Sequence, residues 1–231
     1  MRYALSLLLA ATCTLANAYG VSGQGTWETT LKGRDLDGNT SNGFEAYYDT
    51  VLNITWLADA NYAQTTGHTS AANGGVEPDS VYDSTIKWTD SRMGWDAAQS
   101  WATNLTVYGI NGWRLPTVIG PRTTELQHLF YATMGNVIYD KTSAFYDYDA
   151  TNTGPFKNVG GYYYWSDAVS HIDDSVVTFG PGTGFAPSWP KDFASHAWAV
   201  RSGDIAAVPE PESLALMSVG LAALMLRRRS F

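Results

Sequence analysis

Apolar residues recur at spacings of three and four between Gly94 and Thr106. This spacing places them on one face of a helix, while the polar residues between them face water. The apolar positions are Trp95, Ala98, Trp101, Ala102 and Leu105. We therefore predict a helix over residues 94–106 with one buried side.

A second helical pattern begins at Thr124. Gln127 follows three residues later, which is the arrangement of a capping box. Buried positions are expected at Leu126, Leu129, Phe130 and Met134, before Gly135-Asn136 ends the helix. The sequence predicts a core helix over residues 124–134.

Elsewhere the pattern changes to short runs rich in aromatic and β-branched residues, which are typical of strands. Residues 44–50 and 52–57 indicate a hairpin or two successive strands, and glycine-rich loops are expected over 65–84 and 180–190. Further strands are predicted at 113–115, 162–168, 175–179 and 196–201. The fold class predicted is α+β, with two helices and antiparallel strands.

The N-terminus has the pattern of a secretory signal peptide. Arg2 precedes an apolar run over residues 4–11, and Ala16-Asn17-Ala18 has the small-x-small form that signal peptidase cleaves. We expect cleavage after Ala18 and export of the remainder. The single cysteine, Cys13, lies in the removed segment, so the mature chain is expected to have no disulfide, thiolate metal site or cysteine nucleophile.

The C-terminus combines Pro209-Glu210-Pro211, an uncharged apolar stretch over residues 213–226, and Arg227-Arg228-Arg229. Arginines beside an apolar segment favour the cytoplasmic side of the inner membrane. A helix of this length rises only about 21 Å, which is short of the ~30 Å hydrocarbon core and suits a transient membrane segment better than a permanent anchor.

This order of parts resembles the PEP-CTERM sorting signal. The resemblance implies that exosortase, a membrane cysteine transpeptidase of Gram-negative bacteria, recognises and cleaves the chain near Pro209-Glu210-Pro211. Exosortase and signal peptidase are thus the partners expected during export across the inner membrane. The expected destination is the cell surface or the extracellular matrix of a Gram-negative bacterium.

Between the two signals we expect one domain over residues 19–204 and a linker over 205–208. The whole chain has a formal net charge of −8. The terminal segments hold four of its 14 basic residues and two of its 22 acidic ones, so the part between them is more acidic, at −10. Such a surface repels nucleic acid and anionic lipid.

Four motifs resemble the Lcl C-terminal-type domain. They are Gly112-Trp113-Arg114-Leu115-Pro116-Thr117, Glu125-Leu126-x-x-Leu129, Tyr164-Trp165-Ser166 and Ala197-Trp198-Ala199-Val200-Arg201. The resemblance spans residues 47–204. It implies a C-type-lectin-like fold and an exported domain, in some members linked to adhesion and to binding of sulfated polysaccharide.

The Arg-Leu-Pro-Thr element is also similar to one in formylglycine-generating enzymes, but those act through cysteines. The Glu-Pro-Asn, Gln-Pro-Asp and Trp-Asn-Asp elements of calcium-dependent lectins do not occur either. Trp165-Ser166-Asp167 resembles the last of them in part, which makes Asp167 a candidate ligand-binding residue.

No catalytic motif occurs in the sequence, whether His-Glu-x-x-His, Gly-x-Ser-x-Gly, a Walker loop or a dinucleotide-binding glycine pattern. The four histidines, at 68, 128, 171 and 196, are dispersed. Adjacent strand residues point to opposite faces, so Asp173-Asp174 is better explained as a loop turn than as an acid/base pair. We therefore expect a protein that is not an enzyme.

The run Asp35-Leu36-Asp37-Gly38-Asn39 alternates oxygen-bearing side chains around a glycine, as calcium loops do. Asp35, Asp37 and Asn39 are thus candidate calcium ligands. The run does not fit an EF-hand, because in that register Ala46 would occupy the glutamate position. An Asx-rich β-turn is the alternative interpretation, since Asp, Gly and Asn favour tight turns.

All nine tryptophans lie between the two terminal signals. Trp95, Trp101, Trp113, Trp165 and Trp198 are predicted to be core residues, and Arg114 is a candidate partner for a buried carboxylate.

Trp189, in a loop, and the run Tyr162-Tyr163-Tyr164 are better candidates for an exposed platform on which sugar rings stack. The candidate ligand-binding residues are Tyr163, Asp167, Asp173 and Trp189. The function expected is non-enzymatic binding of exopolysaccharide or sulfated glycan at the cell surface or in the matrix. The alternative is a structural or protein-binding surface component without a glycan ligand.

Overall fold

The computed structural model describes residues 25–68, 91–120, 123–137, 152–160, 162–170, 174–181 and 184–205. The predicted signal peptide, the sorting signal and most of the 65–84 loop lie outside these residues. One cluster of buried apolar side chains runs from Leu31 to Ile205 and joins the helices to the sheets. The described chain therefore has a continuous core.

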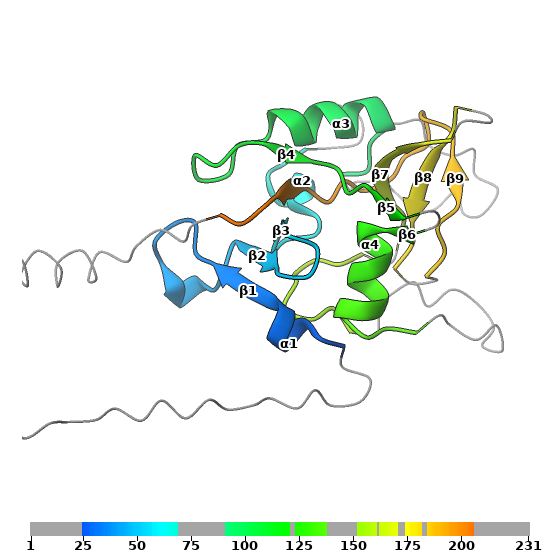
Figure 1. Ribbon diagram of the computed structural model, residues 1–231. Helices are drawn as coiled ribbons and strands as arrows, with labels where there is room; N and C mark the ends of the chain where they lie inside the picture. Colours follow the sequence, from blue (N-terminus) through cyan, green and yellow to red (C-terminus); the bar gives the residue numbers. More distant parts are fainter. Residues whose placement is uncertain are drawn as a thin grey trace, which may run out of the picture.

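A five-stranded antiparallel sheet forms one part of the molecule, in the order β1-β2-β3-β10-β4 (Figure 1). Its strands are β1 (Leu31–Arg34), β2 (Ala46–Asp49), β3 (Ile54–Leu57), β10 (Val200–Ser202) and β4 (Trp113–Arg114). β2 and β3 form the predicted hairpin, in which Asp49 pairs with Ile54. The last described strand, β10, lies between β3 and β4, so the C-terminal part of the domain closes the sheet.

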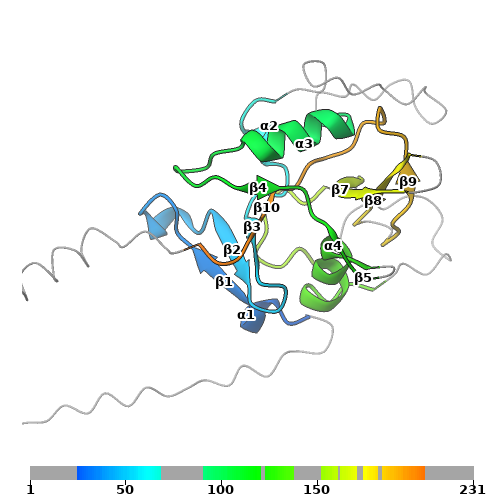
Figure 2. The same cartoon turned by 45° about the horizontal axis from the view of Figure 1, so that its top comes forward.

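A second sheet has three antiparallel strands, β7 (Tyr164–Val169), β8 (Val176–Phe179) and β9 (Ser188–Trp189). β5 (Val118–Gly120) and β6 (Thr123–Thr124) form a separate pair. Figures 1 and 2 both place β9 at the end of the molecule away from β1. The five-stranded sheet thus lies toward the β1 end of the molecule, and the three-stranded sheet lies toward the β9 end.

Two helical segments pack against these strands. α3 (Trp95–Asn104) contacts β4 and β7 and buries Ala98, Trp101 and Ala102, as the apolar spacing predicts. α4 (Glu125–His128) continues into a π-helical turn, η3 (Leu129–Thr133). Shorter turns are α1 (Trp27–Thr30), η1 (Thr40–Asn42) and α2 (Tyr62–Thr65).

The predicted capping box is present at the start of α4. The Gln127 N–H donates to Thr124 Oγ1 at 3.1 Å, and the Thr124 N–H donates to Gln127 Oε1 at 2.9 Å. These two bonds satisfy backbone donors that a helix start leaves free. The sequence signal for this helix start is confirmed.

Large aromatic rings fill the core. Trp198 packs edge-on against Trp56 and Phe156, with ring centroids 5.3 and 5.0 Å apart. Its indole N–H donates to the Leu57 carbonyl, and that of Trp165 donates to the Met93 carbonyl. Four of the five tryptophans predicted as core are buried, namely Trp101, Trp113, Trp165 and Trp198. Trp95 is half-buried.

The prediction of a strand over residues 196–201 is wrong in its boundaries. β10 begins only at Val200, and His196 instead makes an isolated parallel bridge to Tyr164. The segment before β10 passes from the second sheet to the first, since the His196 carbonyl accepts from Trp165 and the Ala199 carbonyl accepts from Leu57. One chain segment therefore ties the two sheets together.

Candidate functional site

Four aromatic rings gather where β9 and the following turn meet the start of β7. Trp189 stacks on Phe193 with centroids 4.6 Å apart and planes 10° from parallel. Phe193 in turn stacks on Tyr162, at 6.1 Å and 12°. Tyr163 lies beside Trp189 at 5.8 Å, with its plane tilted by 58°. We call these four half-buried residues the aromatic cluster.

Charged groups border the aromatic cluster. The Arg92 guanidinium lies 4.3 Å from the Tyr162 ring centroid, within the range of a cation–π contact. Lys191 Nζ lies 5.1 Å from the Trp95 ring and 2.7 Å from Asp174 Oδ1. The region thus combines aromatic rings with an exposed ion pair. A ligand that has both an apolar face and polar groups can contact both.

The Trp189 indole N–H is a further polar group of the cluster. Its Nε1 is buried and has no hydrogen-bond acceptor among the described residues. Buried donors are normally satisfied by a protein group or by water. In the described part of the chain, this N–H is therefore an unsatisfied donor within the aromatic cluster.

The structure brings together two of the four predicted ligand-binding residues, Tyr163 and Trp189. The predicted loop position of Trp189 is wrong, because the residue lies in β9, and the predicted exposure of Tyr164 is wrong, because its ring is buried in the core. Trp189 is half-buried: the Phe193 N–H donates to the Pro190 carbonyl, and this turn places the Phe193 ring on the indole. Asp173 lies outside the described residues. Asp174, its neighbour, is exposed in a left-handed conformation (φ 55°), in accord with a loop turn.

Asp167 lies in a second polar cluster, which is built around Arg114. The Arg114 guanidinium donates from Nη1 and Nη2 to the two oxygens of Glu125, both at 2.8 Å, and the Thr117 N–H donates to Glu125 Oε2 at 2.8 Å. The Glu125 side chain is 4% exposed and that of Arg114 28%. The predicted pairing of Arg114 with a buried carboxylate is confirmed.

The charges in this second cluster perturb one another. The hydrogen bonds to Glu125 raise the pKa of Arg114 above its usual value. Burial raises the pKa of Asp167, while the Thr117 hydroxyl and the Arg114 charge act in the opposite direction. Its N–H donates to the Pro116 carbonyl, which fixes β7 against the Gly112–Thr117 motif.

An acidic cluster lies where the β1–β2 hairpin opens. Asp35, Asp37 and Glu45 each offer a carboxylate oxygen within 4.8 Å of the others. A hydrogen bond from the Asn42 side chain lowers the pKa of Asp37. Partial desolvation raises the pKa of the Tyr108 hydroxyl, and the charges of Asp37 and Glu45 add to the rise. The structure thus groups two of the three predicted calcium ligands with a glutamate.

Asn39, the third predicted calcium ligand, caps the η1 turn. Its Oδ1 accepts from the Ser41 N–H and from the Ser41 hydroxyl. The Asx-turn alternative is also present, because Asp35 Oδ1 accepts from the backbone N–H groups of Asp37, Gly38 and Asn39. The loop is therefore an Asx turn that also gathers carboxylates.

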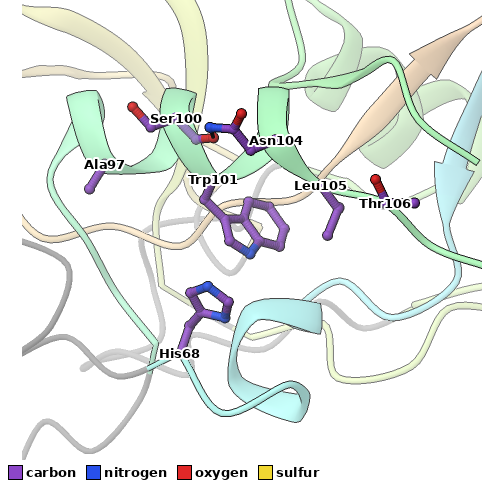
Figure 3. A pocket seen from close by; sticks show the side chains of 7 residues that line it. All are labelled: His68, Ala97, Ser100, Trp101, Asn104, Leu105 and Thr106. Atoms are coloured by element: carbon purple, nitrogen blue, oxygen red, sulfur yellow. Dashed lines mark hydrogen bonds between the residues drawn. The ribbon is translucent and has the colours of Figure 1, made fainter.

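A pocket of about 460 Å³ lies beside α3 (Figure 3). The His68 ring faces the Trp101 indole edge-on there, with centroids 6.4 Å apart. Residues 69–90, which follow His68, lie outside the described residues, so we assign this pocket no ligand. Its lining consists of His68, Ala97, Ser100, Trp101, Asn104, Leu105 and Thr106.

The described histidines lie in three separate places. His68 borders the pocket, His128 Nδ1 lies 3.5 Å from the Thr133 hydroxyl, and the buried His196 ring packs 5.3 Å from that of Tyr164. His171 is outside the described residues. Within the described part of the chain, the acidic cluster is the one group of His, Cys, Asp or Glu side chains with metal-binding spacing.

Comparison with protein families gives one match. The model of the PEP-CTERM protein-sorting motif matches residues 207–229. This agrees with the resemblance seen at Pro209-Glu210-Pro211 and Arg227-Arg228-Arg229. The match supports a chain that is exported and sorted to the cell surface by exosortase.

Comparison with curated proteins and with solved structures gives no significant match. The mixture of helices and antiparallel sheets bears out the α+β class, whereas no fold neighbour supports the lectin-like frame. Among the residues that the structure describes, no helix has the length and apolar character needed to cross a membrane.

Phe193 and Glu45 are members of these clusters that were not identified from the sequence, and neither were the bordering Arg92 and Lys191. Phe193 joins the aromatic cluster through a turn that gives no periodic signal. Glu45 joins the acidic cluster because Arg34 pairs with Ala46, which sets Asp35 opposite Glu45. Prediction of that pairing from the sequence would have required recognition of β1 as a strand.

Proposed function

We propose that this protein is a non-enzymatic component of the cell surface or extracellular matrix of a Gram-negative bacterium, and that its folded domain binds polysaccharide through the aromatic cluster. The single observation that carries the proposal is the stack of Trp189, Phe193 and Tyr162 with Tyr163 at its side. Aromatic rings offer sugars flat apolar surface, and bordering charged groups offer hydrogen bonds. The terminal sorting motif supports a location where polysaccharide is encountered.

The same proposal includes a C-type-lectin-like frame of the Lcl C-terminal type. Its support is that residues of separate motifs contact one another. Arg114 of one motif binds Glu125 of the next, and Tyr164 packs 5.7 Å from Trp198 of the last. The motifs thus behave as one structural unit, as residues that define a shared frame are expected to do.

We assign the domain no catalytic role. The sequence has no cysteine beyond Cys13 and no catalytic motif. Among the ion pairs of the described residues, Arg114 and Glu125 are the most buried, and their two hydrogen bonds join two elements of the fold.

Binding to a panel of bacterial exopolysaccharides and sulfated glycans, with and without calcium, tests this function. The purified protein is expected to bind a restricted set saturably, and Trp189→Ala is expected to weaken binding at least tenfold while thermal unfolding remains cooperative. Tyr108→Ala is the matched control, since Tyr108 is an exposed aromatic residue of the α3–β4 loop, which lies away from β9 in Figures 1 and 2.

The alternative is a structural or protein-binding surface component. The observation in its favour is that the rings of the aromatic cluster already stack on one another, so part of each face serves internal packing. This alternative would be favoured if the wild type bound none of the glycans and Trp189→Ala lowered only the thermal stability of the domain.

A further inference from the structure

Three carboxylates converge at the open end of the β1–β2 hairpin, far in the sequence from the aromatic cluster. Asp35 and Asp37 follow β1, and Glu45 precedes β2. The Glu45 N–H donates to the Arg34 carbonyl at 3.2 Å, which continues the hairpin ladder and holds Asp35 and Glu45 opposite each other. Backbone pairing therefore fixes Asp35 and Glu45 relative to each other.

One oxygen of this group lacks a partner. Asp35 is 3% exposed, and its Oδ1 accepts three backbone N–H groups, with the bond from Gly38 at 2.7 Å. Its other oxygen, Oδ2, is buried and has no hydrogen-bond partner among the described residues. A buried carboxylate oxygen without a donor is costly, and a bound cation removes that cost.

The other two carboxylates are held in place but not saturated. Asp37 Oδ2 accepts from the Asn42 side chain at 2.8 Å, and Glu45 Oε2 accepts from the Leu36 N–H at 2.9 Å. A carboxylate has about four lone-pair sites, so each retains capacity to ligate. The cation nearest in sequence, Arg34, is engaged by Asp204, with Nε 2.7 Å from Oδ1.

The spacing of the oxygens suits a hard divalent cation, and the number of carboxylates favours calcium. Calcium binds oxygen at about 2.3–2.6 Å, so two ligand oxygens of one ion lie at most about 5 Å apart. Magnesium demands near-ideal octahedral geometry and is usually bound by one or two carboxylates, whereas calcium accepts several carboxylates in flexible geometry. The three carboxylates lie within 4.8 Å of one another. From the buried Asp35 oxygen and this spacing, we propose that Asp35, Asp37 and Glu45 bind one calcium ion.

Calcium titration of the purified protein, with calorimetry and thermal unfolding after chelation, tests the site. The wild type is expected to bind one ion with Kd on the order of 10⁻⁴ M, as extracellular calcium modules do, and to unfold at a higher temperature in millimolar calcium. Magnesium at the same concentration is expected to have a smaller effect.

Two variants separate metal binding from folding. Asp35→Asn keeps an oxygen for the three backbone donors and removes the unpartnered one. Glu45→Gln keeps an acceptor for the Leu36 N–H and removes the charge. Each is expected to weaken calcium binding at least tenfold and, in chelator, to be at least as stable as the wild type, because a repulsive charge is gone. Glu28→Gln, at an exposed position in α1, is the matched control.

The absence of calcium-dependent heat and of any thermal shift in the wild type would overturn the proposal. A shift that persisted unchanged in both Asp35→Asn and Glu45→Gln would overturn it as well. Should Asp35→Asn fail to fold, Glu45→Gln still decides the matter. The acidic cluster and the aromatic cluster share no residue, so either proposal can fail while the other stands.

Discussion

The ion pair between Arg114 and Glu125 makes a quantitative prediction about stability. In Arg114→Met, the Glu125 carboxylate remains in a site where its side chain is 4% exposed, with the Thr117 N–H at 2.8 Å as its remaining donor of those described above. Two unit charges about 4 Å apart attract by about 4 kcal/mol at an effective dielectric constant of 20. Removal of one partner from a buried pair typically costs about 3–5 kcal/mol, and we expect a loss in this range at pH 7.

The opposite truncation is expected to cost less. Glu125→Gln leaves the Arg114 charge, but that side chain is 28% exposed and can be solvated by water. Loss of a hydrogen bond to a charged group costs about 1.5–3 kcal/mol. The double variant Arg114→Met/Glu125→Gln, which has no stranded charge, is expected to be more stable than Arg114→Met alone.

Urea unfolding of the wild type, the two single variants and the double variant, followed by tryptophan fluorescence at pH 7, measures these losses. The deficit of Arg114→Met is expected to be partly relieved in the double variant, because Glu125→Gln removes the stranded charge. If the slope of the free energy of unfolding against urea concentration is unchanged, the variant has altered stability and not the surface exposed on unfolding. A deficit of Arg114→Met below about 1 kcal/mol, or a double variant no more stable than Arg114→Met, would refute the reasoning.

The remaining predictions concern the helix cap, Asp167 and the aromatic cluster. Thr124→Ala is expected to cost about 1 kcal/mol and to lower Tm by about 2–4 °C, whereas the exposed neighbour Thr123→Ala has no comparable effect in the same melt. Burial raises the pKa of Asp167 in the folded protein. The protonated side chain therefore makes its full contribution to the free energy of unfolding below about pH 4, and this contribution is lost as the pH rises through the pKa of the folded state. Asp167→Asn should thus match the wild type near pH 3 and exceed it by less than about 1 kcal/mol above pH 5 in urea unfolding, since the group is half-exposed. Tyr163→Ala should reduce glycan binding in equilibrium titrations by about tenfold with a small change in Tm.

The helices and the central hairpin could be predicted because their signals are local. The spacing of Ala98, Trp101 and Ala102 places them on one face, and the side chains of Thr124 and Gln127 carry their own capping chemistry. The sequence also predicted that Arg114 pairs with a buried carboxylate. The identity of that carboxylate, Glu125, depends on how β4 and α4 meet.

The rest depends on contacts between distant segments. β10 lies between β3 and β4 although more than 80 residues separate it from either along the chain, and no periodicity encodes that insertion. β1 has one buried side chain, Leu31, and was not recognised as a strand. Glu45 was missed as part of the acidic cluster for the same reason, and Phe193 was missed because a turn determines its stacking on Trp189.

The most direct test of the central claim is equilibrium binding of the purified protein to the polysaccharide of its own producing cell. The account predicts saturable binding that is inhibited by excess soluble polysaccharide and is weakened at least tenfold by Trp189→Ala, with Tyr108→Ala unchanged. Non-saturable binding, or binding that Trp189→Ala leaves intact in a folded protein, would contradict it.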